Sequence, residues 1–464
     1  MWVFSASGCR WLGAAGSLAV AVGGWAAGTL PVRGGWGLWE PRGSALTVAG
    51  ALLAYLGLTL LVAAWWRYGV LLARGPRDGV VGTLASWTAP LLLAPPLYSA
   101  DVYSYIAQGA MVLEGHDVYG GGPSVLGPGD LGADAAASVG GHWTDTPAPY
   151  GPAFLLLAAG VVKLTGGAVV PSVLLMRLIA LGALALVVWA VRGIGGGPGG
   201  RAGAVWLAAL NPLFLIHVVG GLHNDGLMIG LMLSGVLLAV RGRWVLGCVL
   251  VGLAMMVKSP AAVALLFIGV MVARAAGGGV RGVAKGLLLP GLVAGAVAAG
   301  ATVVAGTGFG WLRTQSVAAE IHTALSLSSD LGLALGTVLG DGSGTVKGVV
   351  QQLGLVVALV IIAVLAWRSW KGLLDPVVGL GLALVALVAL SPMVQPWYLL
   401  WGTAAVAAGA WRSRAGQVLA VFSAALVYET APSGRTPWYG FVVAGVVLGL
   451  GVVWLRRESW AARR

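Results

Sequence analysis

The sequence predicts an all-α, polytopic membrane protein. Of its 464 residues, 59% are hydrophobic and only 9% are charged, whereas a soluble domain carries about 25% charged residues. The apolar residues form long continuous runs along the whole chain, which predict transmembrane helices. These runs do not alternate with polar residues, so a transmembrane barrel is excluded. The 76 glycines and 21 tryptophans suit close helix packing and anchoring at the membrane surface.

We expect about 13–15 spans in a single domain that covers residues 1–464. The first, 11–30, is expected to be a retained helix, because a lone Arg10 before it makes a poor signal peptide. Two further apolar segments, 152–166 and 331–340, are short and interrupted. The candidate spans are 11–30, 45–66, 80–97, 171–191, 203–218, 225–240, 244–257, 259–274, 286–306, 348–366, 375–390, 397–410, 416–430 and 438–454.

The basic residues predict how these spans are oriented. With both termini cytoplasmic and fourteen alternating helices, six of the 27 basic residues face outward and two, Lys163 and Arg177, lie in apolar segments. The remaining 19 (27 − 6 − 2) face inward, as the positive-inside rule requires. A crossing by 152–166 would invert everything after it, so we expect this segment not to cross. The six outward residues are Arg33, Arg42, Lys258, Arg313, Lys347 and Arg435.

The net charge of +12 does not indicate a nucleic-acid partner. The basic residues stand singly or in pairs between spans, which is the pattern of a cytoplasmic membrane protein rather than of a nucleic-acid site. The same orientation leaves two long segments outside the membrane, 98–151 and 307–330. These outer segments hold much of the ionisable chemistry of the chain, so we expect the active site to face the extracytoplasmic side.

Segment 98–151 begins with Asp101, directly after an apolar span. From 101 to 114 the spacing is helical, with Asp101, Ser104, Tyr105 and Gln108 on one face, which predicts an amphipathic helix in the membrane interface. Partial desolvation there should raise the basicity of Asp101, which suits a general base. The alternative is structural: Ser99 or Asp101 caps the helix. The two roles are compatible.

Further candidates stand at the outer ends of other spans. His223, Asn224 and Asp225 form a polar turn that is either a helix cap or a site for a sugar or a metal. Lys258 and Arg313 are cations that could bind an anionic lipid phosphate. The buried Arg177 is either such a cation or half of an internal ion pair.

Aromatic and polar residues complete the candidate set. His142 and Tyr150 close segment 98–151, where aromatic rings can stack on sugars. Gln395, Trp397 and Tyr398 precede a span, and they are either interfacial anchors or lining of the substrate site.

Several motifs in order resemble the actinobacterial polyprenol-phosphomannose-dependent α-1,6-mannosyltransferases, which are GT-C glycosyltransferases. The resemblance covers roughly residues 80–450. It implies a GT-C helical fold with Asp101 in the place of the loop acid that acts as the base. The wider class often has two adjacent acids there, and this chain has one. The motifs are ADVYSYIAQG, the YGP that closes the long loop, ALNPLFLIHVVGGLHNDG, VKSP and SPMVQPWYLLW.

The resemblance also implies the reaction. The donor would be β-linked polyprenyl-phosphate-mannose, and the acceptor an α-1,6-mannan glycolipid of lipomannan or lipoarabinomannan synthesis. Asp101 would deprotonate the acceptor 6-hydroxyl, which attacks the anomeric carbon and inverts it. Lys258 or Arg313 would stabilise the departing polyprenyl phosphate. A divalent metal is possible, although no acidic pair supports one.

Two alternatives remain open from the sequence. Another GT-C transferase could use the same carrier with arabinose or glucose. A lipid or sugar transporter would instead predict matching internal repeats and intramembrane charges along a path, and the sequence has no clear repeat.

Overall fold

The computed structural model describes residues 5–75 and 78–461, and all regular secondary structure in this part of the chain is helical. The first half contains α1 (Ala6–Ala27), α2 (Ser44–Arg74), α3 (Val80–Thr88), α4 (Asp101–Glu114), α5 (Ala133–Ala136), α6 (Pro152–Thr165), α7 (Val169–Ile194), α8 (Gly197–Ala208), α9 (Pro212–Phe214), the π-helix η5 (Leu215–Gly220) and α10 (Asp225–Val240). The second half contains α11 (Trp244–Met255), η6 (Ser259–Ala262), α12 (Val263–Ala275), α13 (Val280–Ala305), α14 (Val317–Glu320), α15 (Leu327–Leu339), α16 (Thr345–Trp370), α17 (Pro376–Leu390), η9 (Pro396–Tyr398), α18 (Leu399–Ala410), α19 (Arg414–Leu426) and α20 (Trp438–Ala461).

This is a multi-pass membrane protein. Among the described residues, α2, α7, α13, α16 and α20 are long and apolar enough to cross a membrane, and α8 with the following Pro212–Gly220 makes a sixth span if the 45° bend between them is counted within one. Most of the other expected spans correspond to shorter apolar helices. One of them, α11, has 12 residues and rises about 18 Å, less than the ~30 Å hydrocarbon core.

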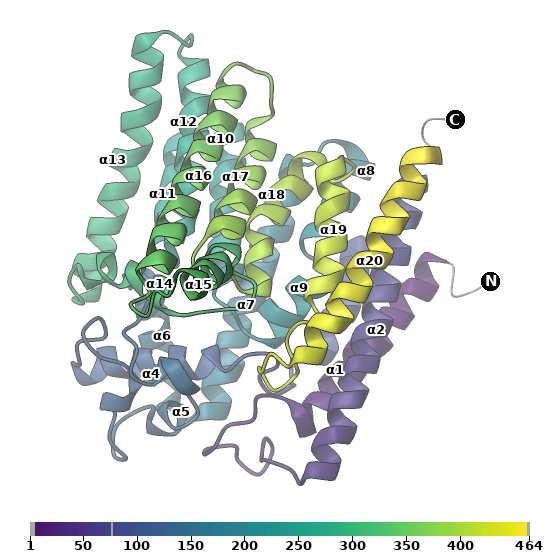
Figure 1. Cartoon of the computed structure of the whole chain (residues 1–464), viewed down its shortest axis with the longest axis vertical. Coiled ribbons are helices and arrows are strands. Elements are labelled where there is room, and N and C mark those ends of the chain that lie inside the picture. Colours follow the sequence, from purple (N-terminus) through teal and green to yellow (C-terminus); the bar gives the residue numbers. More distant parts are fainter. Residues whose placement is uncertain (1–4, 76–77, 462–464) are drawn as a thin grey trace.

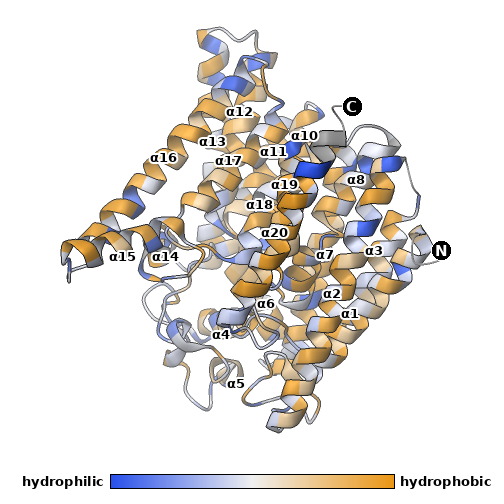
Figure 2. Ribbon diagram, turned by 45° about the vertical axis from the view of Figure 1, so that its right-hand side comes forward, coloured by the Kyte–Doolittle hydropathy of each residue, from blue (hydrophilic) through white to orange (hydrophobic). Residues whose placement is uncertain are grey.

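The helices run between two faces of the molecule (Figure 1). We call one the α4 face, because α4, α5 and α6 lie there together with α14. The opposite face holds the turn between α12 and α13 and also α8, which follows directly on the end of α7. Hydrophilic residues gather near the helix ends and in the loops, whereas the outer sides of the long helices are hydrophobic (Figure 2). Their exposed apolar side chains suit contact with lipid tails; Val303, for example, is 76% exposed.

Helix α6 begins and ends on the α4 face. Its first turn is bonded to the end of α11, where the Phe154 N–H donates to the Met256 carbonyl at 3.1 Å. Just past its last turn, Gly167 packs against the backbone of Gly132, close enough that an added Cβ would lie 2.6 Å from the Gly132 nitrogen. Segment 152–166 therefore runs along this face, with both of its ends there.

Glycine pairs allow neighbouring helices to approach closely. A Cβ at Gly269 of α12 would lie 2.2 Å from the carbonyl oxygen of Gly286 in α13, and one at Gly235 of α10 would lie 2.5 Å from that of Gly247 in α11. Either methyl group would force the backbones apart. Glycines at these contacts thus allow consecutive helices to pack closely, as small residues do in other membrane proteins.

Helix α4 has the bounds that the periodicity predicts, but its surroundings differ. We expected an amphipathic helix lying in the interface with one wet face. In the structure every side chain from Val102 to Met111 is buried, because α6 packs along one side and the rest of segment 98–151 folds over it. The polar residues Ser104 and Gln108 are therefore inside the protein.

Candidate active site

A buried arginine holds the chain between α3 and α4 in place. Arg177 of α7 is 2% exposed and donates to the carbonyl oxygens of Leu92 at 3.0 Å and Ala94 at 2.6 Å. It also reaches the carbonyl oxygens of Pro95 at 3.4 Å and Val219 at 3.3 Å. The guanidinium supplies donors that this irregular backbone lacks. Arg177 thus positions the segment leading into α4, and it neither lines the pocket described below nor forms an ion pair among the described residues.

Asp101 begins α4 with its carboxylate free of the helix end. The Asp101 backbone N–H donates to the Ser99 hydroxyl at 3.0 Å, so the serine caps the first turn. Ala100, at the cap position itself, has no side-chain bond to offer. The Asp101 side chain is 26% exposed and points toward His223. Of the two caps that the sequence allowed, the structure uses Ser99 and leaves the aspartate for other contacts.

Three neighbouring rings, two of them stacked, form a wall beside Asp101. The Nδ1 atom of His223 lies 3.3 Å from Asp101 Oδ2, at ion-pair distance but without hydrogen-bond alignment. The His223 ring stacks on Trp397, with centroids 3.7 Å apart. The centroid of the His217 ring, in the π-helix η5, lies 5.0 Å from that of Trp397 and 5.7 Å from that of His223. Single π-helical turns often occur at functional sites. The stack on Trp397 fixes the imidazole against the carboxylate.

A buried ion pair stands next to this wall. Lys258 donates to both carboxylate oxygens of Asp225, at 2.9 and 3.1 Å, and Trp401 Nε1 donates to one of them at 2.7 Å. The ammonium also lies 4.3 Å from the centroid of the Tyr398 ring. Asp225 is 1% exposed, whereas the Lys258 side chain is 15% exposed. An ammonium has three donors, so one can still face a ligand.

Asp101 and Lys258 open onto a common pocket of about 410 Å³. One part is polar and the other is apolar, and both are built from residues far apart in the sequence. The polar part includes Asp101, Tyr150, Lys258, Gln395, Trp397 and Tyr398. The apolar part includes Val263 of α12, Leu359 and Ile362 of α16, Leu387 of α17 and Met393. Leu359 is 62% exposed, so the apolar part reaches the lipid-facing surface.

The ionisation of Asp101 differs from the expectation that desolvation would raise its basicity. Burial does raise the pKa of the Asp101 carboxyl, but the imidazole of His223, the charge of Lys258 and the Ser99 hydroxyl lower that pKa more, and it ends below its ordinary value. Asp101 is therefore a carboxylate at neutral pH. Burial and the charge of Asp101 raise the pKa of Tyr150 well above its usual range, so this phenol stays neutral and can donate a hydrogen bond.

Two candidates from the sequence lie away from the pocket. His142 is exposed in a short turn, and its neighbour Trp143 lines the pocket instead. Arg313 is also exposed, and the next two residues, Thr314 and Gln315, face the pocket. In each case the chain turns so that the adjacent side chains point inward.

Two other candidates support the lining from behind. Tyr105 packs edge-to-face on Tyr150 with centroids 5.3 Å apart, and its hydroxyl accepts from the Asn224 backbone N–H at 3.4 Å. The Asn224 side chain is buried without a hydrogen-bond partner among the described residues.

Two residues of the site were not singled out from the sequence. Trp401 follows Trp397 by one helical turn within the same quoted motif, and this i, i+4 spacing could have revealed it. His217 lies inside a predicted span, and a lone histidine there is usually interpreted as a residue of the core. Both of its ring nitrogens are buried without a partner among the described residues, and only the fold brings it beside His223.

No group of three or more His, Cys, Asp or Glu side chains suited to a metal ion occurs in the part of the chain that the structure describes. The two oxygens of Asp225 are engaged by Lys258 and Trp401. Asp101 is flanked by Ala100 and Val102, so an adjacent second carboxylate is missing. The donor set beside the pocket is poor for a divalent cation, which prefers several oxygen ligands.

Comparison with known proteins decides the family. Residues 10–274 match the family model described as alpha-(1->6)-mannopyranosyltransferase, N-terminal domain, and residues 322–457 match an MptB C-terminal domain. The chain belongs to the alpha-(1->6)-mannopyranosyltransferase family. It is therefore a glycosyltransferase. Asp101, His223, Asp225 and Lys258 all fall within the first matched region, and Trp397 within the second, so the pocket joins both parts of this mannosyltransferase.

Full-length relatives agree with this assignment. A probable alpha-(1->6)-mannopyranosyltransferase of Mycolicibacterium smegmatis is 34% identical over 97% of this chain and 89% of its own length. An alpha-(1->6)-mannopyranosyltransferase of Mycobacterium tuberculosis is 32% identical over 90% and 81%, and alpha-(1->6)-mannopyranosyltransferase B of Corynebacterium glutamicum is 31% identical over 98% and 82%. No solved structure matches the chain.

Proposed function

We propose that this mannosyltransferase takes mannose from polyprenyl-phosphate-mannose and adds it, with inversion, to an α-1,6-mannan glycolipid acceptor of lipomannan or lipoarabinomannan synthesis. The single observation that carries the proposal is the two-part pocket. Its polar part, with Asp101 and Lys258, suits a sugar phosphate, and its apolar part, along α12, α16 and α17, suits an isoprenoid chain. A lipid-linked donor needs both parts, whereas a nucleotide sugar needs no apolar arm.

The pocket residues take the following parts in the reaction. Asp101 accepts the proton of the acceptor 6-hydroxyl while that oxygen bonds to the anomeric carbon. The bond from the anomeric carbon to the phosphate oxygen breaks, and its electron pair leaves with polyprenyl phosphate. Lys258, with one donor left by Asp225, stabilises the developing phosphate charge. Tyr150, Trp397 and Gln395 hold the sugar by stacking and hydrogen bonds.

We place this site on the extracytoplasmic side of the membrane. The support is the uneven distribution of basic residues in the sequence, which puts the α4 face outside. A lipid-linked donor enters such a site from the bilayer, through the exposed end of the apolar arm at Leu359.

The donor is tested with purified enzyme and a short α-1,6-mannoside. Transfer is expected from polyprenyl-phosphate-mannose and not from GDP-mannose or from the glucose and arabinose forms of the same carrier. Leu359→Trp, which blocks the apolar arm, should raise KM for the long-chain donor. Leu353→Trp is the matched control, because Leu353 is exposed on the same helix but does not line the pocket. Transfer from GDP-mannose alone would contradict the proposal.

A further inference from the structure

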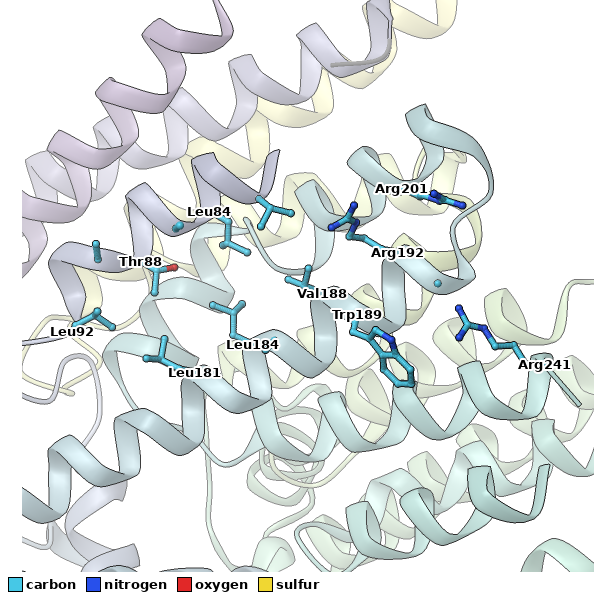
Figure 3. A pocket seen from close by; sticks show the side chains of 15 residues that line it. Leu84, Thr88, Leu92, Leu181, Leu184, Val188, Trp189, Arg192, Arg201 and Arg241 are labelled. Carbon is cyan, nitrogen blue, oxygen red and sulfur yellow. The ribbon is translucent and has the colours of Figure 1, made fainter. Parts of the chain in front are cut away.

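A second cavity shares no lining residue with the pocket of the candidate active site. It is a groove of about 770 Å³ between α3 and α7, and Figure 3 shows the side chains that line it. Leu84, Leu181, Leu184 and Val188 form its wall, and Thr88 adds a lone hydroxyl. From Leu181 to the last turn of α7 the groove follows the helix for roughly 16 Å. That length is about half of the ~30 Å hydrocarbon core, or one leaflet.

Three arginines stand at one end of this apolar groove (Figure 3). Arg192 comes from the last turn of α7, Arg201 from α8, and Arg241 from the end of α10. Because α7 runs from the α4 face to the opposite face, these charges lie at the far side of the protein from Asp101. Three separate elements bring guanidinium groups to the same end of one groove.

These positive charges are not compensated by the protein. The groove has no acidic residue in its lining, and within the described residues none of the three arginines forms an ion pair or a side-chain hydrogen bond. Arg241 is held beside the groove by packing, with its guanidinium 5.9 Å from the centre of the Trp189 ring. Exposed cations next to an apolar surface fit a ligand that joins an anion to a hydrocarbon chain.

We propose that this groove binds an anionic phospholipid of the surrounding bilayer, with one acyl chain along α3 and α7 and the phosphate on Arg192, Arg201 and Arg241. The charge and the shape of the site both favour this occupant. A soluble phosphate ester would use the arginines and leave the apolar wall empty, and a zwitterionic lipid would bring its own cation to a cationic end. Val81 and Trp189 are 40% and 43% exposed, so the groove is open sideways to lipid.

The bound lipid bridges two elements that also support the active site. At its other end, α7 carries Arg177, which holds the carbonyls of Leu92, Ala94 and Pro95 just after α3. A lipid that joins α3 to α7 therefore reinforces the same pair of elements from the opposite face. We expect occupancy to raise the melting temperature of the protein.

The test is lipid retention and thermal unfolding of the full-length protein, purified in detergent and titrated with phosphatidylglycerol, phosphatidylcholine or glycerol 3-phosphate. Phosphatidylglycerol should stay bound in native mass spectrometry and raise the melting temperature, whereas the other two should not. The triple variant Arg192→Gln, Arg201→Gln, Arg241→Gln should weaken phosphatidylglycerol binding at least about tenfold, equivalent to ~1.4 kcal/mol. Its control, Arg281→Gln, Lys285→Gln, Arg368→Gln, removes the same charge from exposed positions elsewhere and should bind normally.

A second variant tests the acyl chain separately from the charge. Ala185→Trp fills the groove and should also weaken phosphatidylglycerol binding, whereas Leu178→Trp, at an exposed site on the same helix outside the lining, should not. Equal binding of phosphatidylcholine, an equal effect of glycerol 3-phosphate, or normal binding by the triple variant would each overturn the proposal. Circular dichroism and gel filtration confirm that each variant is folded.

Discussion

The Nδ1 atom of His223 lies 3.3 Å from Oδ2 of Asp101, and the two residues come from chain segments 122 positions apart (223 − 101). His223 is itself fixed by stacking on Trp397. The imidazole is one reason why the pKa of the Asp101 carboxyl stays below its ordinary value despite burial. We infer that His223 is a positioning residue that keeps the base ionised and oriented.

His223→Phe should therefore change the pH dependence of transfer. The phenyl ring keeps the stack on Trp397 but removes the nitrogen beside Asp101. Burial, which raises the pKa of Asp101, then has less opposing it, so the acidic limb of kcat/KM should move to higher pH. In the wild type that limb should lie below the ordinary aspartate pKa of ~3.9, since the pKa of Asp101 is lowered.

The measurement is kcat/KM against pH for both proteins, with His322→Phe as the control. His322 pairs with Asp330 at an exposed position outside the pocket, so its loss should leave the profile unchanged. An unshifted acidic limb in His223→Phe would show that the imidazole does not set the ionisation of Asp101.

Removing only one member of the Lys258–Asp225 pair should cost more stability than replacing both members with apolar residues. Lys258→Met leaves the carboxylate of Asp225, only 1% exposed, without its cation, and we expect a loss of about 3–5 kcal/mol. The double variant Lys258→Met, Asp225→Leu removes both charges and should recover most of that stability. Neither variant should recover donor affinity, because both lack the ammonium in the pocket.

Thermal unfolding in detergent measures the first effect, and KM for the lipid-linked donor measures the second. Asp330→Asn, at an exposed ion pair, should cost no more than about 1 kcal/mol. A normal KM in the double variant would show that Lys258 does not bind the phosphate of the donor.

Arg177→Met should loosen the segment that precedes α4. The methionine fills much of the same space but donates no hydrogen bonds to the carbonyls of Leu92, Ala94 and Pro95. Leaving buried acceptors unpaired costs about 1–3 kcal/mol each, so we expect a clearly lower melting temperature and faster hydrogen exchange at the start of α4. The turnover number should fall more than the affinity for the donor changes, because Asp101 is displaced rather than the phosphate site. Unchanged exchange there would contradict the positioning role of Arg177.

Chelation should leave the reaction intact. Asp225 already holds Lys258 and Trp401, and Asp101 has no adjacent carboxylate, so we propose that Lys258 provides the positive charge that a divalent cation supplies elsewhere. Initial rates with excess EDTA should match those with added Mg²⁺ or Mn²⁺. A loss of transfer on EDTA, restored by either metal, would contradict this.

The sequence predicted the parts that depend on local pattern. Helical spacing gave the bounds of α4 from Asp101 to Glu114, and the motifs gave the family. It could not show the contacts that depend on how distant helices cross. Nothing near Arg177 in the sequence points to the carbonyls of Leu92 and Ala94, and nothing near Asp101 points to His223.

The same limit explains where the structure departs from the expected site. The pattern of one helix predicts burial, which raises the pKa of Asp101, whereas the opposing groups His223 and Lys258 come from other segments. Residue type favours His142 and Arg313 as ligand-binding residues, whereas the turn geometry directs Trp143 and Gln315 toward the pocket. Side-chain direction in an irregular loop does not follow a sequence period.

The role of Asp101 as the base is tested by the rate of mannose transfer by Asp101→Asn. Purified wild type and variant are given radiolabelled polyprenyl-phosphate-mannose and a short α-1,6-mannoside at saturating concentrations. The amide keeps the shape of the side chain but cannot accept the proton, so kcat should fall at least about 100-fold with donor binding and melting temperature retained. Transfer at the wild-type rate by Asp101→Asn would show that Asp101 is not the base.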